Sequence, residues 1–254
     1  DALLFVSVTG LATPSIDARL INRMGFSPHI RRLPLFGLGC VAGAAGVSRS
    51  FDQVRAHPES VAVLLSVELC SLTLQRDDLS IPNLISSGLF GDGAAAVVVV
   101  GEDHPLAQSA HGPQILDTRS VFYPDTEHVM GWDISERGFK VVLSADVPRI
   151  AGENLPLDVD SFLTDHQLHR DDIHSWICHP GGPKVLEALQ AGLELPQGAL
   201  DLTWKSLNEV GNLSSTSVLM VLEDTLDTNP PAGSYGLLLA MGPGFCCELV
   251  LLRW

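Results

Sequence analysis

The sequence predicts an α/β protein in which two related halves stack their sheets around a pair of central helices. Apolar runs of strand length alternate with helix-like segments along the whole chain, which is typical of this class. The order of elements also repeats. A residue preceded by glycine opens a helix in each half, Cys40 in the first and Asn212 in the second. A buried strand follows at one spacing, with Leu65 and Leu237 each 25 residues further on. We therefore expect Cys40 and Asn212 at equivalent helix starts, with their helices back to back.

The first half, residues 1–112, alternates strands and helices. Continuous apolar runs predict buried strands, and apolar residues recurring every three to four positions predict helices. In chain order we expect a strand at 2–8, a helix at 14–24, an extended segment at 33–38, a helix at 41–56, a strand at 61–67, a loop or short helix at 78–87 and a strand at 94–100. The last two strands are expected to be buried on both faces.

The second half, residues 113–254, follows the same order after an opening strand and helix. We expect strands at 114–122 and 139–144, an irregular segment at 123–138, a helix with its flanks at 147–168, a strand at 173–178, a helix at 184–193, a helix at 213–226 and strands at 234–240 and 246–252. The first half lacks the opening strand and helix, so it looks truncated at its start.

Composition excludes several classes of function. The chain of 254 residues carries 30 acidic and 15 basic side chains, a net charge of −15 that repels nucleic acid and anionic membranes. No apolar run approaches the roughly 18 residues that a membrane span needs. The odd number of cysteines and the lack of a CxxC pair argue against a disulfide scaffold or a zinc site and favour a reducing, cytoplasmic location. The five are Cys40, Cys70, Cys178, Cys246 and Cys247.

Three residues are candidates for covalent chemistry. Cys40 opens a helix whose positive end lowers a thiol pKa, although a buried structural cysteine is the alternative. His179 ends a strand just before a Gly-Gly loop, where a structural histidine is also plausible, and Asn212 suits a plain helix cap. As a set they suit thiolate catalysis, with the histidine as base and an amide–imidazole pair as oxyanion hole.

Five motifs surround these residues in a fixed order. They are GCVAGAAG around Cys40, GLFGDGAAA around Phe90, WICHPGGP around His179, GNLSS around Asn212 and GPGF at Pro243. With these motifs the whole chain resembles the type III polyketide synthases, the chalcone-synthase-like branch of the thiolase superfamily. The resemblance implies a thiolase-like αβαβα layered fold with two pseudo-repeated halves.

The resemblance also implies a mechanism. A Cys40 thiolate, paired with imidazolium His179, takes an acyl group from a CoA thioester. His179 and Asn212 then bind malonyl-CoA, which decarboxylates and attacks the acyl group. Phe90 corresponds to a gatekeeper phenylalanine, with an ordinary core residue as the alternative. No metal and no cofactor other than CoA thioester substrates is implied, and the partner is a second copy of the chain.

Further positions correspond to substrate contacts, or alternatively to neutral core variation. Cys70 and Thr73 stand where the plant enzymes have two cavity threonines, and Thr13 replaces a methionine that reaches into the partner subunit. Gly131 corresponds to the cavity floor, and Val141 replaces a second gatekeeper phenylalanine, which widens the pocket. Ser214 is expected to contact substrate, and Gly181 and Gly182 to contact CoA. Small side chains here resemble bacterial enzymes that make α-pyrones from fatty acyl starters.

Two alternatives remain from the sequence. A ketoacyl-ACP synthase III-like enzyme shares the cysteine, histidine and asparagine but performs one condensation. A non-catalytic binding paralogue is the rival from a different class. The family also has a segment before the point where this sequence starts, with basic residues that grip CoA phosphates, so activity of residues 1–254 alone is an open expectation.

Overall fold

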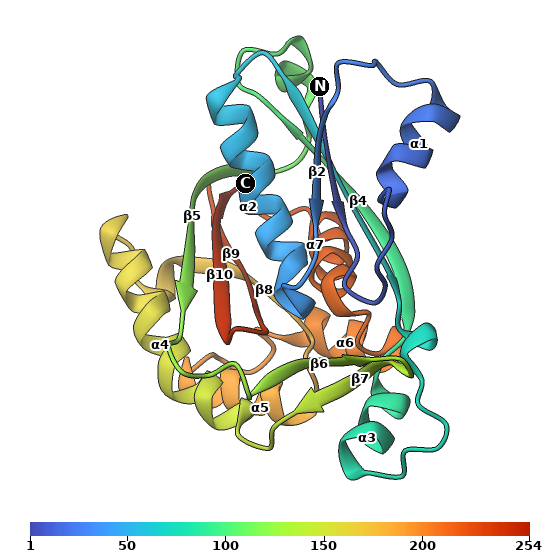
Figure 1. The fold of residues 1–254 in the computed structure, drawn as a ribbon. Coiled ribbons are helices and arrows are strands. Elements are labelled where there is room, and N and C mark those ends of the chain that lie inside the picture. Colours follow the sequence, from blue (N-terminus) through green and yellow to red (C-terminus); the bar gives the residue numbers. More distant parts are fainter.

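Two helices, α2 (Ala42–Ala56) and α7 (Ser217–Asp227), lie between two four-stranded sheets (Figure 1). The computed structural model describes residues 1–254. Val47 of α2 and Val218 of α7 belong to one buried apolar cluster, which also takes in side chains from both sheets. The predicted back-to-back placement of the two helices is confirmed.

The first sheet has the strand order β2-β1-β3-β4. Its strands are β1 (Ala2–Val6), β2 (Arg31–Leu35), β3 (Val61–Leu69) and β4 (Asp92–Val100). β1 runs parallel to both β2 and β3, whereas β3 and β4 are antiparallel. β4 therefore forms one edge of this sheet.

The second sheet has the order β5-β10-β9-β8. Its strands are β5 (Gln114–Phe122), β8 (Ile173–Cys178), β9 (Tyr235–Gly242) and β10 (Cys246–Arg253). The parallel pair β8–β9 followed by antiparallel β10 repeats the pattern β1–β3–β4 of the first sheet. β5 pairs with β10 on the side that has no counterpart beside β4.

Helices lie outside both sheets, although those outside the first sheet leave the outer face of β4 uncovered. α1 (Ile16–Met24) lies outside the first sheet, and α4 (Val147–Asp165) and α5 (Pro183–Gly192) lie outside the second (Figure 1). Alternate residues of β9 serve both sides, because Leu237 packs toward α4 and α5 while Leu238 packs toward α2 and α7. The layer order confirms the predicted αβαβα arrangement.

The remaining elements gather at the end of the sheets where α2 begins. α3 (Ile81–Leu89) and α6 (Asp201–Val210) flank this end, and a hairpin of β6 (Met130–Ser135) and β7 (Gly138–Leu143) crosses beneath it (Figure 1). None of the seven helices is both long and apolar enough to span a bilayer.

Three expectations from the sequence were wrong. β3 alternates between buried and half-buried residues, and β4 exposes Ala94, Ala96 and Val98, because no helix packs on that outer face. Residues 123–138 are not wholly irregular, since β6 lies within them. The helix expected from 213 begins as a short 3-10 turn at Ser214–Thr216 before α7. The division between residues 112 and 113 stays a prediction.

Candidate active site

Cys40 lies at the junction between the two halves. It sits in a single 3-10 turn, Gly39–Val41, that runs directly into α2, and only 6% of its surface is exposed. Its Sγ donates to Ser214 Oγ at 3.8 Å, across 174 residues of chain. The expected position at a helix start is therefore observed, one turn before the regular helix.

The GPGF turn between β9 and β10 fixes this cysteine from the other side. Gly39 has a φ of +55°, and a Cβ atom there would lie 2.4 Å from Pro243 Cδ. Any side chain at position 39 would thus both strain the backbone and displace the turn. The two motifs act as one structural unit that holds Cys40.

Asn212 is held at both ends of its amide group. Its Oδ1 accepts the Ser214 N–H at 2.8 Å, an Asx turn, and its Nδ2 donates to the Gly181 carbonyl at 3.3 Å. These two partners assign the orientation of the amide. Since a side-chain NH₂ has two hydrogens, the second remains for a ligand. The predicted capping role and a ligand-facing donor are thus compatible in one residue.

Ser214 adopts a backbone conformation that is uncommon for a serine. Its φ is +53°, in the left-handed region. Non-glycine residues held there cost about 1–3 kcal/mol and gather at functional sites. The conformation presents Ser214 Oγ to Cys40, which gives this predicted substrate contact a place beside the thiol.

His179 continues β8 for one residue and then turns into the Gly-Gly loop. Its backbone N–H donates to the Leu239 carbonyl at 2.9 Å. The imidazole is 6% exposed, yet neither ring nitrogen has a hydrogen-bond partner within the protein. Buried polar groups are nearly always paired, so this unpaired imidazole is a candidate functional group.

Burial favours the uncharged forms of both Cys40 and His179. Desolvation raises the pKa of Cys40 to about 11. The hydrogen bond with the Ser214 hydroxyl lowers it, the negative charge of Glu68 raises it further, and Asn212 lowers it. Desolvation lowers the pKa of His179 to about 4. No hydrogen bond joins the two residues. Burial thus opposes a charge on either group alone, and the thiolate–imidazolium pair expected from the sequence stays a prediction.

Phe90 and the Gly-Gly loop meet the Asn212 segment. Asn212 donates its backbone N–H to the Leu89 carbonyl at 2.8 Å and accepts from the Gly91 N–H at 3.0 Å, which places Phe90 alongside it. Phe90 is half-buried. Gly181 supplies the carbonyl that orients Asn212, and Gly182 precedes α5.

The remaining predicted contacts are spread more widely. Cys70 is 6% exposed, and burial, with the charges of Glu68 and Cys40, raises its pKa, so it lies in the surroundings of Cys40. Thr73 donates to the Cys70 carbonyl at 2.8 Å. Thr13 is exposed in the loop after β1.

Gly131 and Val141 lie on opposite faces of the β6–β7 hairpin. Gly131 pairs with Val142, and Val141 pairs with Trp132. Directly opposed residues of an antiparallel pair share a face, and neighbours along a strand alternate. The roles expected for Gly131 at the cavity floor and for Val141 at the second gatekeeper position stay predictions.

Comparison with known proteins agrees with these motifs and this geometry. The chalcone and stilbene synthase N-terminal domain model matches residues 1–104, and the C-terminal domain model matches residues 114–254. The chain belongs to the chalcone and stilbene synthase family. These are the type III polyketide synthases.

Named relatives support the same family. The chain is 56% identical over 255 residues to a 1,3,6,8-tetrahydroxynaphthalene synthase of Streptomyces peucetius subsp. caesius, covering 100% of this chain and 67% of the relative. It is 42% identical to a putative chalcone synthase of Bacillus subtilis, covering 100% of this chain and 70% of that protein. The solved 1,3,6,8-tetrahydroxynaphthalene synthase of Streptomyces coelicolor superposes with a TM-score of 0.94 at 35% identity, covering 100% of this chain and 71% of that one. The chain thus spans about two thirds of these relatives.

The sequence analysis did not predict a buried polar network that lies behind the site of this synthase. Glu68 is fully buried and accepts from the Val8 N–H at 3.1 Å, from Thr9 Oγ1 at 2.9 Å and from Ser215 Oγ. Ser215 Oγ also bonds to Ser66 Oγ at 2.8 Å. The sequence could have indicated this network, because Ser66 and Glu68 fall on the alternate positions of β3 that face the core.

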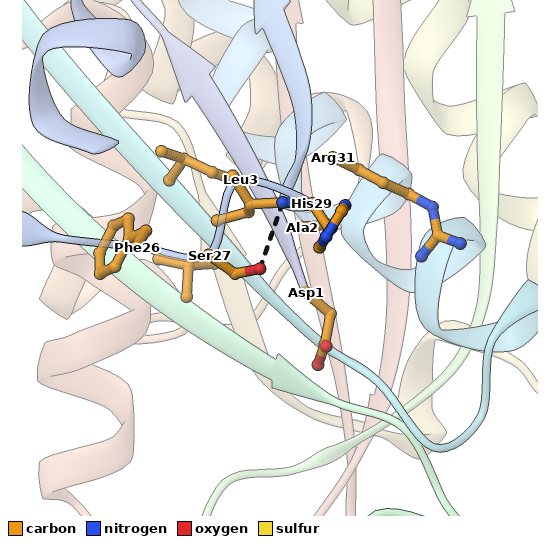
Figure 2. Close-up of a pocket in the computed structure, with 9 residues that line it drawn as sticks. Asp1, Ala2, Leu3, Phe26, Ser27, His29 and Arg31 are labelled. Atoms are coloured by element: carbon orange, nitrogen blue, oxygen red, sulfur yellow. Dashed lines mark hydrogen bonds between the residues drawn. The ribbon is translucent and has the colours of Figure 1, made fainter. Parts of the chain in front are cut away.

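The hollow drawn in Figure 2 lies away from the synthase motifs. It has a volume of about 350 Å³ and is lined by residues such as Asp1, Phe26, His29 and Arg31 at the amino-terminal ends of β1 and β2. The bond from the Val8 N–H to Glu68 lies just beyond the carboxyl end of β1, which is the end of the strand nearer to Cys40. No predicted site residue lines this hollow, and no cluster of three potential metal ligands occurs in the chain.

Proposed function

We propose that this type III polyketide synthase uses Cys40 as its acyl carrier and His179 with Asn212 as its decarboxylating pair. One observation carries the proposal. The three motif residues come from both halves, are all buried, and are tied together through Ser214 and the Gly181 carbonyl. A buried thiol, a buried imidazole without a partner in the protein and an oriented amide support a catalytic role over a purely structural one.

The first step loads the enzyme. The Cys40 thiol gives its proton to His179, and the thiolate attacks the carbonyl of an acyl-CoA and expels CoA thiolate, which the imidazolium can protonate. Burial opposes each charge singly, as the pKa directions of both groups indicate. Forming the two opposite charges together offsets that cost, and the turn leading into α2 favours the thiolate.

The second step extends the chain. The free hydrogen of Asn212 Nδ2 and a ring N–H of neutral His179 donate to the thioester carbonyl of malonyl-CoA. Loss of CO₂ leaves an enolate that these donors stabilise, and its carbon attacks the Cys40 thioester, which releases the thiolate. Removing one such donor typically costs about 10²–10³ in rate. Phe90, beside Asn212, gives this site an apolar wall that favours loss of a carboxylate.

The substrates follow from this chemistry. CoA thioesters supply both the starter and the extender, with the Gly181–Gly182 loop at the CoA side. Cys70 and Thr73 border the thiol and Gly131 and Val141 lie on the hairpin, so these four residues shape the product. The assembly we propose is a homodimer in which the exposed Thr13 loop meets the partner.

Two classes of product are the alternatives for this enzyme. α-Pyrones are expected from the small side chains at the cavity positions. A polyhydroxylated naphthalene is favoured by the relative that is 56% identical and carries the name of a tetrahydroxynaphthalene synthase.

Mass spectrometry tests the function and the product together. The purified protein is mixed with malonyl-CoA alone and with a panel of acyl-CoAs, and both intact protein and small products are weighed. An acyl adduct on Cys40 that disappears as pyrone or tetrahydroxynaphthalene masses appear supports the proposal. A single β-ketoacyl product indicates the one-condensation alternative, and absence of any adduct on the folded full-length protein indicates a binding paralogue.

A further inference from the structure

The GPGF turn that holds Cys40 has a glycine on each side of its proline. Gly244 has a φ of +142°, a backbone conformation that residues with side chains rarely adopt. A Cβ atom at Gly242 would lie 2.6 Å from the Leu38 carbonyl oxygen, so the turn packs backbone to backbone on the segment before Cys40. The glycines permit this close approach but bring no side chain that could keep the turn in place.

The other side of the turn is held by the hydroxyl group of Thr126. The Phe245 N–H donates to Thr126 Oγ1 at 2.6 Å, and this hydroxyl donates in turn to the Tyr123 carbonyl at 2.6 Å. The Phe245 carbonyl accepts from the Tyr123 N–H at 2.8 Å. Phe245 is almost fully buried, and a buried backbone N–H needs a hydrogen-bond partner. The Thr126 hydroxyl is the partner that the structure gives to this one.

The segment that carries Thr126 is itself fixed from two directions. The Thr126 carbonyl accepts from the Val129 N–H at 3.0 Å, just before β6 begins. The Tyr123 hydroxyl donates to Asp158 of α4 at 2.5 Å, and the Tyr123 ring packs beside the Phe245 ring with their centroids 6.1 Å apart. Thr126 therefore joins the turn to well-anchored parts of the second half.

We propose that Thr126 is a positioning residue for acyl transfer, whose hydroxyl keeps the GPGF turn pressed against the loop that carries Cys40. This inference rests on the proposed function. Thr126 acts through Phe245 and Pro243, and the Pro243 ring fills the space that a side chain at Gly39 would need. Acylation requires the sulfur and the thioester carbon to approach to about 3–3.5 Å, and a misplacement of about 1 Å costs up to about 10²-fold in rate. Release of the turn therefore slows the loading of Cys40 and leaves the proposed CoA contacts in place.

The test compares the full-length wild-type protein with three variants. Thr126→Val keeps the shape of the side chain without the hydroxyl, and Thr126→Ser keeps the hydroxyl. Thr225→Val is the matched control, because the buried Thr225 hydroxyl donates to the Val221 carbonyl within α7 and is remote from the turn. Acylation of Cys40 is followed by intact mass over a range of acetyl-, malonyl- and hexanoyl-CoA concentrations.

Thr126→Val is expected to lower the maximal acylation rate by about ten- to a hundredfold. The thioester concentration that gives half of this rate is expected to stay at the wild-type value. Thr126→Ser restores the rate, and Thr225→Val leaves it unchanged. A general loss of stability would not separate the rate from half-saturation in this way, and it would affect the two valine variants alike.

Thr126→Ala covers the case in which Thr126→Val does not fold, because the smaller side chain leaves room for water at the Phe245 N–H. A wild-type acylation rate in either folded variant, or an equal loss of rate in Thr225→Val, overturns this inference. The acyl adduct on the wild-type protein then leaves the proposed function standing. A wild-type protein that accepts no acyl group from any of the three thioesters overturns the proposed function itself.

Discussion

Gly43 of α2 lies so close to Ser215 that a Cβ atom at position 43 would stand 2.0 Å from the Ser215 carbonyl oxygen. Each residue follows the site residue of its half, Cys40 or Asn212, by three positions. The two helix starts therefore meet backbone to backbone at the point where the halves are related. The missing side chain at 43 brings the nucleophile and the amide together.

Gly43→Ala is predicted to destabilise the protein. The added methyl group would press on the Ser215 backbone and on the buried Val218 side chain, and overpacking of this kind costs about 1–3 kcal/mol in the free energy of unfolding. Urea unfolding followed by circular dichroism measures it. Gly88→Ala in α3 is the matched control, because a Cβ atom there meets nothing within 4 Å and alanine gains up to about 1 kcal/mol over glycine in a helix. Equal urea midpoints for the two variants would contradict the close contact.

His179→Ala is predicted to make Cys40 less reactive near neutral pH. Burial raises the pKa of Cys40 to about 11. A neighbouring imidazolium would offset that effect further than the Ser214 and Asn212 hydrogen bonds do. The alkylation rate of the variant should therefore rise with pH toward this value, while wild type reaches its plateau at lower pH. Iodoacetamide labelling of Cys40, followed by mass spectrometry across a pH series, gives the two profiles. His174→Ala, an exposed histidine of β8, is the control, and superimposable profiles for wild type and His179→Ala would refute the pairing.

Asn212→Ala and Cys40→Ala are predicted to separate the two half-reactions. Loss of the Asn212 amide should slow decarboxylation of malonyl-CoA by about 10²–10³ while Cys40 still accepts an acyl group. Cys40→Ala should show the reverse, with no acyl adduct and continuing release of CO₂. Carbon dioxide release and adduct mass are measured on the same samples. An Asn212→Ala protein that decarboxylates at the wild-type rate would remove Asn212 from the oxyanion site.

Glu68→Gln is predicted to change how stability depends on pH. Burial raises the pKa of the Glu68 carboxyl above 4.5, opposed by its bonds from Ser215, Val8 and Thr9. A carboxyl whose pKa is raised on folding binds its proton more tightly in the folded state. Its contribution to stability is therefore complete below about pH 4.5 and is lost as pH rises through the raised value.

Glutamine does not titrate, so the wild-type advantage over the variant should shrink with rising pH in that window, by at most about 1.4 kcal/mol per pH unit. Urea unfolding from pH 4 to pH 7 measures the difference between the two proteins. Parallel stability curves would show that Glu68 has the same proton affinity folded and unfolded.

The layered fold was predictable because it depends on local patterns. Apolar runs, helical spacing and the repeated order around Cys40 and Asn212 gave most strands and helices. The exposure of Val98 was not predictable, since a run of apolar residues does not say whether a helix covers the second face. β6 was missed although Met130, Trp132 and Ile134 alternate with less apolar residues, which is the period-two pattern of a half-buried strand.

The site was predictable as a set of residues and not as a set of interactions. The order of the motifs identified Cys40, His179 and Asn212 as candidates. No local sequence pattern shows that Asn212 donates to the Gly181 carbonyl. Glu68 was passed over because its partners come from distant segments of the chain. The register that separates Gly131 from Val141 depends on the hairpin pairing, which a position-by-position resemblance does not contain.

The contacts that join Cys40 to Ser214 and Glu68 to Ser215 span 174 and 147 residues. Closures over such separations slow folding, because the entropy of closing a long loop is lost before the contact is gained. During synthesis the cysteine leaves the ribosome long before the serines that surround it. Until they arrive, its thiol has the reactivity of an ordinary exposed cysteine. We expect catalytic competence to appear late and all at once, so the rate at which refolding protein becomes acylated reports the docking of the two halves.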